Sequence, residues 1–335
     1  MAKSAIALLF ASVVFQSSLA AQQVVRVGFF PNITHAQALV GQAQGTFEKQ
    51  LGPGVRVEWK AFNAGPSAIE ALFANAIDLA YIGPSPTISG FVQSHGEALR
   101  VIAGASSGGA SLVIRAGENI HSAKDFHGKK IATPQLGNTQ DVALRAWLHA
   151  NGLNTVDKGG DVQVIPTENP NQLPLFLSGR LDAAWAPEPW ATRLVHDGHA
   201  TIFLDERRLW PNSQFVAAHL VVRTKFLGDH PDLVKKWLRV HVELTDWINA
   251  HPAEARTTLN AEVQKLTSKS LPPDELSEAL THLTITYDPF RTSLVTSAQR
   301  SFDAGFLRHP PDLSNLYDLT LLNQVLAEKG KKKIP

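Results

Sequence analysis

The sequence contains no cysteine among its 335 residues. This absence excludes disulfide bonds, thiolate metal sites, catalytic thiols and the lipid-bearing cysteine that tethers many exported bacterial proteins. The net charge is also small, because 31 Lys and Arg residues are balanced by 30 Asp and Glu residues. Such a chain has no overall field that would favour nucleic acid or an anionic membrane. We therefore expect neither as a partner.

Long hydrophobic runs are absent beyond the amino terminus, so we expect no stable membrane insertion. Residues 1–20 carry Lys3, an apolar run from Ala5 to Phe15, and small residues up to Ala20. This order predicts a signal peptide cleaved after Ala20. The alternative, a membrane anchor, would need about 20 apolar residues, which is more than the run supplies. We expect a bacterial periplasm, because a freely soluble exported protein needs an enclosed compartment to serve its own cell.

Signatures of catalysis are weak or missing. The sequence has no G-x-G-x-x-G, no phosphate-binding loop ending in G-K-S/T and no H-E-x-x-H. The segment Gly83-Pro84-Ser85-Pro86-Thr87 resembles a nucleophile elbow but lacks the final glycine. The 13 histidines are scattered rather than clustered at metal-ligand spacing. We expect no catalytic residue, no metal and no cofactor.

Short apolar segments alternate with amphipathic segments through the first two thirds of the chain. Strands are expected at residues 24–29, 55–61, 78–82, 100–105, 111–115, 130–133, 162–166, 182–185 and 220–223. Helices fill most of the intervals between them, which is typical of a parallel α/β sheet with crossover helices. The last third favours long amphipathic helices, such as residues 232–249, and shows almost no strand signal.

The alternation predicts two α/β lobes rather than one. We expect residues 21–108 and 220–335 to form lobe I and residues 109–219 to form lobe II. The chain would cross between the lobes twice, near residues 106–112 and 217–220, and the two crossings would form a hinge. A ligand cleft between the lobes follows from this arrangement.

Polar clusters lie where the expected strands give way to helices. They contain Asn32, Thr34 and His35; Asn63, Gly65, Pro66 and Ser67; Gly83, Pro84 and Ser85; and Gly137, Asn138, Thr139 and Gln140. The carboxyl ends of parallel strands share one edge of a sheet, and each helix amino terminus there offers free N–H groups and a positive dipole. The same residue types also cap helices without any ligand, so one cluster alone would indicate nothing. Several clusters on one edge favour an anion site.

The segment after the expected strand at 182–185 adds Trp185, Glu188 and Trp190. The indoles are interpreted either as walls of a cleft around an organic tail or as ordinary core. A cleft-facing Glu188 would repel an anion unless it pairs with a cationic group of the ligand or with a neighbouring donor. No Lys or Arg falls inside the clusters, which suits a weakly hydrated sulfonate better than a doubly charged phosphate.

Four blocks of the chain carry a family resemblance. Residues 27–29, 63–86, 125–132, and 179–183 together with 187–189 resemble the periplasmic aliphatic-sulfonate, taurine and nitrate binding proteins of ABC importers. The resemblance covers Val24 to Gly330, and residues 63–86 are its most specific part. It implies a periplasmic binding protein-like α/β fold with two lobes, a hinged ligand cleft lined by the polar clusters, and a membrane permease as partner.

The resemblance leaves the ligand open. The main expectation is a monomeric, non-enzymatic solute-binding protein that captures a small organic anion, an aliphatic sulfonate, for ABC-type import and sulfur acquisition. Relatives of this fold also carry taurine, nitrate or pyrimidine precursors of thiamine. Pyrimidine-precursor synthases resemble the fold as well, and a ligand sensor that docks on a receptor would look the same in sequence. These alternatives remain beside the main one.

Overall fold

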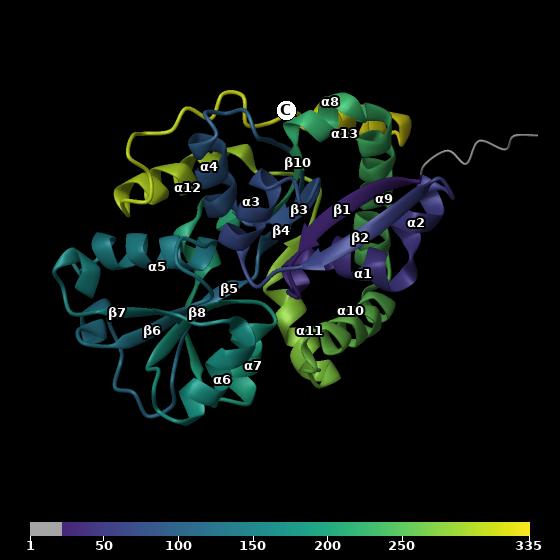
Figure 1. Cartoon of the computed structure of the whole chain (residues 1–335). Helices are drawn as coiled ribbons and strands as arrows, with labels where there is room; N and C mark the ends of the chain where they lie inside the picture. The colour runs from purple at the N-terminus through teal and green to yellow at the C-terminus, as the bar shows by residue number, and fades with distance from the viewer. Residues whose placement is uncertain (1–21) are drawn as a thin grey trace, which may run out of the picture.

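The computed structural model describes residues 22–335, and the predicted signal peptide lies outside this range. The described chain forms two lobes, each built on one mixed sheet (Figure 1). Sheet A, in lobe I, has the strand order β11-β4-β10-β3-β1-β2. Sheet B, in lobe II, has the order β7-β6-β8-β5-β9. The predicted α/β class is confirmed.

Lobe I contains both ends of the described chain. Its strands are β1 (Gln23–Phe29), β2 (Val55–Ala61), β3 (Leu79–Ile82), β4 (Leu99–Gly108), β10 (Val216–Arg223) and β11 (Leu283–Ile285). Its helices are α1 (Ala36–Gln44), α2 (Thr46–Leu51), α3 (Gly65–Phe73), α4 (Pro84–Gln93), α8 (Thr224–Asp229), α9 (Pro231–Ala250), α10 (Pro252–Thr267), α11 (Pro273–Thr281), α12 (Arg291–Asp303) and α13 (Thr320–Glu328).

Lobe II is the teal part of Figure 1. Its strands are β5 (Ala110–Ile114), β6 (Lys130–Thr133), β7 (Gln163–Pro166), β8 (Ala183–Pro187) and β9 (Thr201–Asp205). Its helices are α5 (Thr139–Ala150), α6 (Asn169–Leu177) and α7 (Trp190–His196). Strands β5 and β8 are buried along their whole length, so they read as continuous apolar runs rather than alternating ones.

The two sheets repeat one arrangement. In sheet A, β1 pairs in parallel with β2 and β3, while β10 runs antiparallel to β3 and β4. In sheet B, β6 pairs in parallel with β7 and β8, while β5 runs antiparallel to β8 and β9. Strands β5 and β10 each come directly after a crossing from the other lobe, and in sheet A the edge strand β11 also pairs antiparallel with β4. Each sheet therefore holds, as an inner strand, the first strand that the chain forms after crossing into that lobe.

The crossings lie close to the expected hinge. Strand β4 ends at Gly108 and β5 begins at Ala110, and both Gly108 and Gly109 have a φ of +77°, which only glycine adopts without strain. The return crossing lies between β9 and β10. Strand β10 already pairs with β4 at Val216, so residues 216–219 belong to sheet A and not to lobe II, where the expected boundary at residue 220 had placed them.

Strands β9 and β11 were not expected from the sequence. Each lies at the edge of its sheet, β9 beside β5 and β11 beside β4. Strand β11 has three residues, and the apolar run of β9 is limited to residues 202–204, so both are too short to show a periodic pattern. Pairing with a neighbouring strand, rather than local sequence, fixes both as strands.

Helices cover both faces of each sheet. Helices α1, α9, α10 and α13 bury one face of sheet A, and α3, α4 and α12 bury the other. The rings of Phe47 and Trp237 stack in the first of these layers with centroids 3.8 Å apart. Helix α5 covers one face of sheet B, and α6 and α7 cover the opposite face. Because the helices cover the faces of the sheets, the loops at the carboxyl ends of the parallel strands remain uncovered, and those of the two lobes face one another.

Candidate functional site

A cavity of about 30 Å³ lies between the two lobes. It is lined by Phe30, Asn32, Thr34, His35, Asn63, Ala64, Gly65, Gly83, Pro86, Gly109, Pro134, Asn138, Thr139, Gln140, Asn169, Pro187 and Ala217. We call this space the head cavity. None of these lining residues is Asp, Glu, Lys or Arg. A volume of this size holds only a few water-sized groups.

Every predicted polar cluster contributes to the head cavity. The predicted residues that line it are Asn32, Thr34, His35, Asn63, Gly65, Gly83, Asn138, Thr139 and Gln140. Among the lining residues that the prediction missed, Asn169 opens α6 directly after β7. It follows the same strand-to-helix rule as the others, so that rule could have found it. Gly109 and Ala217 lie at the crossings and Pro187 at the end of β8, and none of the three carries a polar side chain that would have marked it.

The amino termini of four helices reach the head cavity. Helix α3 begins at Gly65, α5 at Thr139 and α6 at Asn169, and α4 follows the lining residue Gly83. Asn138 caps α5 by accepting a 2.9 Å hydrogen bond from the N–H of Asp141 through Oδ1. Each such terminus carries unpaired N–H groups and the positive end of a helix dipole. Two of them come from each lobe, so an anion between the lobes would be favoured from both sides.

His35 supplies a neutral donor. The side chain is buried, and its Nδ1 accepts a 3.2 Å hydrogen bond from the N–H of Phe30. Burial lowers the pKa of His35 to about 3, so the ring is neutral at physiological pH. In a neutral ring whose Nδ1 is an acceptor, Nε2 carries the proton. His35 therefore offers an N–H group to a ligand without adding a charge.

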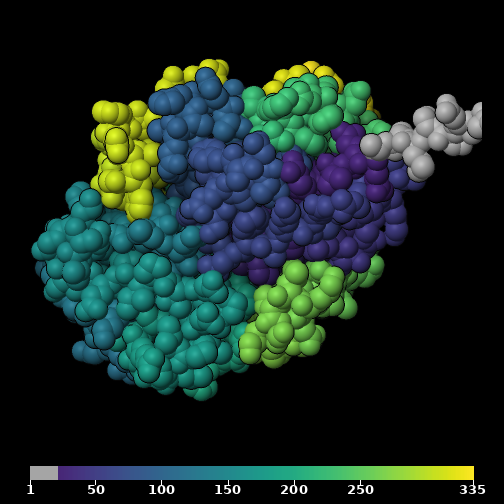
Figure 2. Space-filling view, viewed as in Figure 1, coloured from purple at the N-terminus to yellow at the C-terminus, as the bar shows by residue number. Residues whose placement is uncertain are grey.

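The lobes touch along a seam beside the head cavity. Asn63 Nδ2 donates to the carbonyl of Pro134 over 3.2 Å, and Gln135 Nε2 donates to Ser67 Oγ over 3.1 Å. A methyl group on Gly83 would lie 2.2 Å from Thr139 Oγ1, so lobe II closes against the bare backbone of lobe I at this point. In the space-filling view the atoms of lobe II meet those of lobe I along this boundary (Figure 2).

A second set of bonds joins the lobes near α7. Trp190 Nε1 donates a 2.8 Å hydrogen bond to Asn32 Oδ1. The N–H of Ile33 donates to the carbonyl of Glu188 over 3.2 Å, and Glu188 is itself held within lobe II, where its N–H donates to the carbonyl of Gly109 over 2.9 Å. Asn32 is thus held by lobe II through its amide oxygen, which leaves its NH2 group for a ligand.

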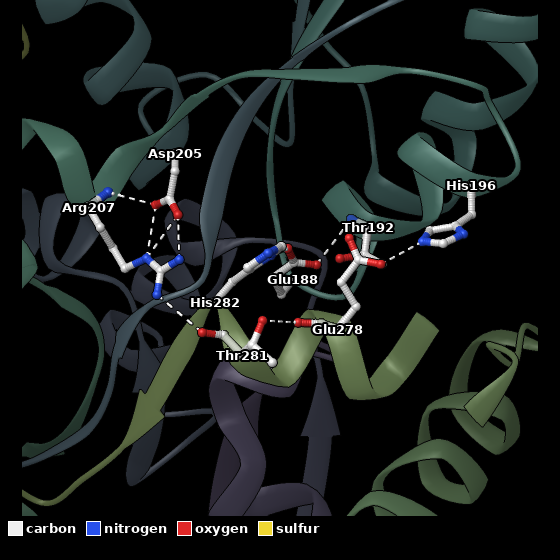
Figure 3. A network of polar contacts seen from close by, with 8 residues as sticks. All are labelled: Glu188, Thr192, His196, Asp205, Arg207, Glu278, Thr281 and His282. Carbon is white, nitrogen blue, oxygen red and sulfur yellow. Dashed lines mark hydrogen bonds and ion pairs between the residues drawn. The ribbon is translucent and has the colours of Figure 1, made fainter. Parts of the chain in front are cut away.

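The structure places Glu188 away from the head cavity, contrary to the predicted ligand role. The side chain is fully buried; Oε1 lies 2.7 Å from His282 Nδ1, and Oε2 accepts from the N–H of Thr192 over 3.1 Å (Figure 3). The bond from Glu188 raises the pKa of His282. Both carboxylate oxygens are therefore occupied by partners within the protein. Glu188 ties α7 to the end of α11 instead of facing a ligand.

Trp185 also lies outside the cleft. Its ring is fully buried in the core of lobe II, and its Nε1 donates a 2.9 Å hydrogen bond to Glu206 Oε2. Burial raises the pKa of Glu206 to about 7. The indole belongs to the face of sheet B that α5 covers, and sequence alone does not say which face a strand residue takes when both faces are buried.

The remaining predicted residues lie close by but do not line the head cavity. Pro66, Ser85 and Gly137 line a separate cavity of about 290 Å³ on the side of α3, α4 and α5. Pro84 is buried in the first turn of α4, and Ser67 is engaged with Gln135 in the seam. The sequence therefore identified the right loops, but only some residues of each loop line the head cavity.

A polar network connects lobe II to the segment around α11 (Figure 3). Arg207, in the return crossing, pairs with Asp205 and donates to the carbonyl of Thr281 over 3.1 Å. His196 at the end of α7 lies 2.8 Å from Glu278 of α11. Together with the pair of Glu188 and His282, these contacts hold α11 against both α7 and the crossing. These contacts connect the two lobes at a second place, separate from the seam that contains Ser67 and Gln135.

Two further features bear on the function. Within residues 22–335, no group of three or more His, Cys, Asp or Glu side chains is placed to hold a metal ion. In the same described range, no helix has the length and apolar character needed to cross a membrane.

Two lobes joined by two crossings, each with a mixed sheet, and a cavity between their facing loops define a periplasmic binding protein fold. The alkanesulfonate-binding protein SsuA from Xanthomonas axonopodis pv. citri, solved with MOPS bound, matches with a TM-score of 0.71 and 19% identity over 89% of this chain and 97% of that chain. The periplasmic nitrate-binding protein NrtA from Synechocystis PCC 6803 matches with a TM-score of 0.74 and 16% identity over 91% of this chain and 89% of that chain. The predicted fold is confirmed.

The chain belongs to the NMT1-like family, whose model matches residues 19–262. It is 27% identical over 233 residues to the taurine-binding periplasmic protein of Escherichia coli K12, which covers 69% of this chain and 68% of that protein. The resemblance drawn from the sequence is confirmed by these matches.

Proposed function

We propose that this protein is an extracytoplasmic solute-binding protein that captures a small organic anion, an aliphatic sulfonate, for ABC-type import. The observation that carries the proposal is the head cavity, where neutral donors and helix amino termini from both lobes converge and no charged side chain lines the wall. Similarity to sulfonate-, taurine- and nitrate-binding proteins supports the same class of ligand.

The donor set suits a singly charged, weakly hydrated anion. Three oxygens of a sulfonate can accept from the NH2 group of Asn32, the Nε2–H of His35 and the hydroxyl of Thr139, with helix N–H groups completing the shell. Helix termini supply partial charges only. A phosphate dianion would leave one charge without a full counter-charge in this cavity, so it is disfavoured.

Binding between the lobes provides a signal for a transporter. A ligand that contacts both Asn32 and Thr139 stabilises the closed arrangement relative to an open one, because the open form offers it only one lobe. A membrane permease of the ABC type would then recognise the closed form. Export by a signal peptide cleaved after Ala20, and residence in the periplasm, belong to the same proposal.

Catalysis is not part of the proposal. The one titratable side chain that lines the head cavity is His35, and burial lowers its pKa to about 3, outside the range useful for proton transfer near neutral pH. The small volume of the head cavity, about 30 Å³, supports nitrate as the second candidate ligand. A pairing of Glu188 with a ligand ammonium is not supported, because His282 and Thr192 already occupy that carboxylate.

Isothermal titration calorimetry on the mature chain tests the proposal. Methanesulfonate, nitrate, sulfate and phosphate would be titrated in turn, and the thermal melting of the protein would be followed with each anion. We expect methanesulfonate to bind, and a ligand at 100 times its Kd to stabilise the protein by about 2.7 kcal/mol. Binding of nitrate alone would favour the second candidate, and binding of neither would refute an anion site.

A further inference from the structure

A larger cavity, of about 330 Å³, opens beside the head cavity at the outer edge of the cleft. Its walls come from residues 31–32 and 61–63 of lobe I, residues 168–170 and Trp190 of lobe II, and residues 266–267 at the end of α10. We call it the mouth pocket. Its walls come from both lobes, so its shape depends on their closure in the same way as that of the head cavity.

Three asparagines form the border between the two spaces. Asn32, Asn63 and Asn169 line both the head cavity and the mouth pocket. Asn32 and Asn169 accept hydrogen bonds through their amide oxygens, from Trp190 at 2.8 Å and from Gln172 at 3.3 Å. Their NH2 groups are left to meet an anionic head. The two spaces therefore adjoin at a border of amide side chains, two of which keep their NH2 groups for a ligand, while that of Asn63 donates to Pro134.

Beyond this border the walls become apolar. Phe62, Trp190 and Leu266 face the mouth pocket together with two prolines, and the one charged residue among its lining is Glu168, which is exposed. The indole N–H of Trp190 already donates to Asn32, and the ring is 2% exposed, so it adds only an apolar edge to the wall that Phe62 and Leu266 form. An amphipathic ligand would find donors on one side of the asparagines and hydrocarbon on the other.

We propose that the mouth pocket binds the organic tail of the ligand whose anionic head lies in the head cavity. This inference rests on the proposed function and narrows it to sulfonates that carry an apolar tail of several carbon atoms. The volumes favour this division, because the head cavity of about 30 Å³ accepts a head group and the mouth pocket of about 330 Å³ has room for a short chain or ring. Inorganic anions would leave the mouth pocket unused.

A rival location for the tail lies across the seam. The cavity of about 290 Å³ beside α3 is also apolar and includes Phe73 and Phe306. It shares Pro86 alone with the head cavity, whereas the mouth pocket shares three polar residues with it. The mouth pocket is therefore the more direct continuation of the site.

The dependence of affinity on tail length tests the inference. Methane-, butane- and hexanesulfonate would be titrated into the parent protein and into the variants Phe62→Ala, Leu266→Ala and Phe73→Ala. Each methylene that the pocket buries should tighten binding about fourfold. We expect Phe62→Ala and Leu266→Ala to lower the ratio of butanesulfonate to methanesulfonate affinity about fivefold, with methanesulfonate binding unchanged. Phe73→Ala, the matched control on the rival cavity, should leave the ratio intact.

The possible results separate this inference from the proposed function. If no sulfonate binds to the parent protein, the function proposed above fails. If methanesulfonate binds but Phe62→Ala and Leu266→Ala leave the ratio unchanged, the tail does not lie in the mouth pocket and the inference is overturned. A loss confined to Phe73→Ala would place the tail in the rival cavity and overturn it as well. Unchanged methanesulfonate binding in each variant also shows that the variant is folded.

Discussion

Gly83 offers a direct test of closure. The residue has φ −74° and ψ 164°, a conformation that alanine adopts freely, so its backbone does not require glycine. A methyl group there would lie 2.2 Å from Thr139 Oγ1 and 3.3 Å from its Cβ, on the opposite lobe. The shorter distance is more than about 1 Å below the separation of about 3.5 Å at which non-bonded heavy atoms normally touch. The clash therefore exists in the closed form and is relieved when the lobes separate.

The expected cost of Gly83→Ala follows from this geometry. Overpacking of one methyl group costs about 1–3 kcal/mol, which raises the Kd about 5- to 150-fold. The folding stability of the ligand-free protein should fall less than the binding free energy does. The lobes can open slightly to relieve the clash, and alanine reduces the conformational freedom of the unfolded chain. Affinity and stability should therefore respond differently to this one substitution.

Calorimetry with methanesulfonate and thermal melting of the ligand-free protein would measure the two effects. Thr139→Ala removes the atom at 2.2 Å, so the double variant of Gly83→Ala and Thr139→Ala should bind more tightly than the two single effects predict. Wild-type affinity in Gly83→Ala would refute the closed contact as part of binding. An equal loss of stability and affinity would mean that the methyl group disturbs lobe I itself.

Three further outcomes are expected. Asn32→Ala leaves Trp190 Nε1 without its acceptor and should weaken methanesulfonate binding about tenfold by calorimetry. Burial raises the pKa of Glu206 from 4.5 to about 7, so the protonated side chain stabilises the folded state. About 3 kcal/mol of folding stability should therefore be lost as the pH rises from 4.5 through 7. Glu206→Gln should abolish this loss in thermal melts recorded as a function of pH. The pKa of His282 is raised in the folded state, so protonation of this histidine stabilises the fold. This contribution to folding stability is fully present below about pH 6.5 and is lost as the pH rises through the folded-state pKa. His282→Gln should flatten the melting profile in that higher window, and an unchanged profile would mean that the bond to Glu188 contributes nothing.

The strands inside the sheets could be predicted closely because their residues repeat a simple pattern. Strand β2 at residues 55–61 and β6 at residues 130–133 begin and end where the sequence indicates. The direction of a strand has no such signature, so the antiparallel course of β5 and β10 could not be foreseen. Directions are fixed by the path of the chain between the lobes rather than by local composition.

The site could be predicted as a set of loops but not as a set of contacts. A single rule, that polar residues between a strand and a helix lie at the carboxyl edge of the sheet, finds loops from both lobes. It fails for Glu188, because the partner that occupies its carboxylate, His282, lies 94 residues further along the chain. It also fails for Trp185, whose ring turns to a buried face of sheet B. Long-range partners decide which side chains of a loop remain free.

The place of β10 inside sheet A has a consequence for the order of synthesis. Strand β10 lies between β3 and β4 in sheet A, yet the ribosome makes it only after the whole of lobe II. A nascent chain that ends before Val216 therefore has β3 and β4 without the strand that joins them. Pairing over such a long stretch of chain is slow to form. Lobe I therefore completes its sheet only after every strand of lobe II has been synthesised.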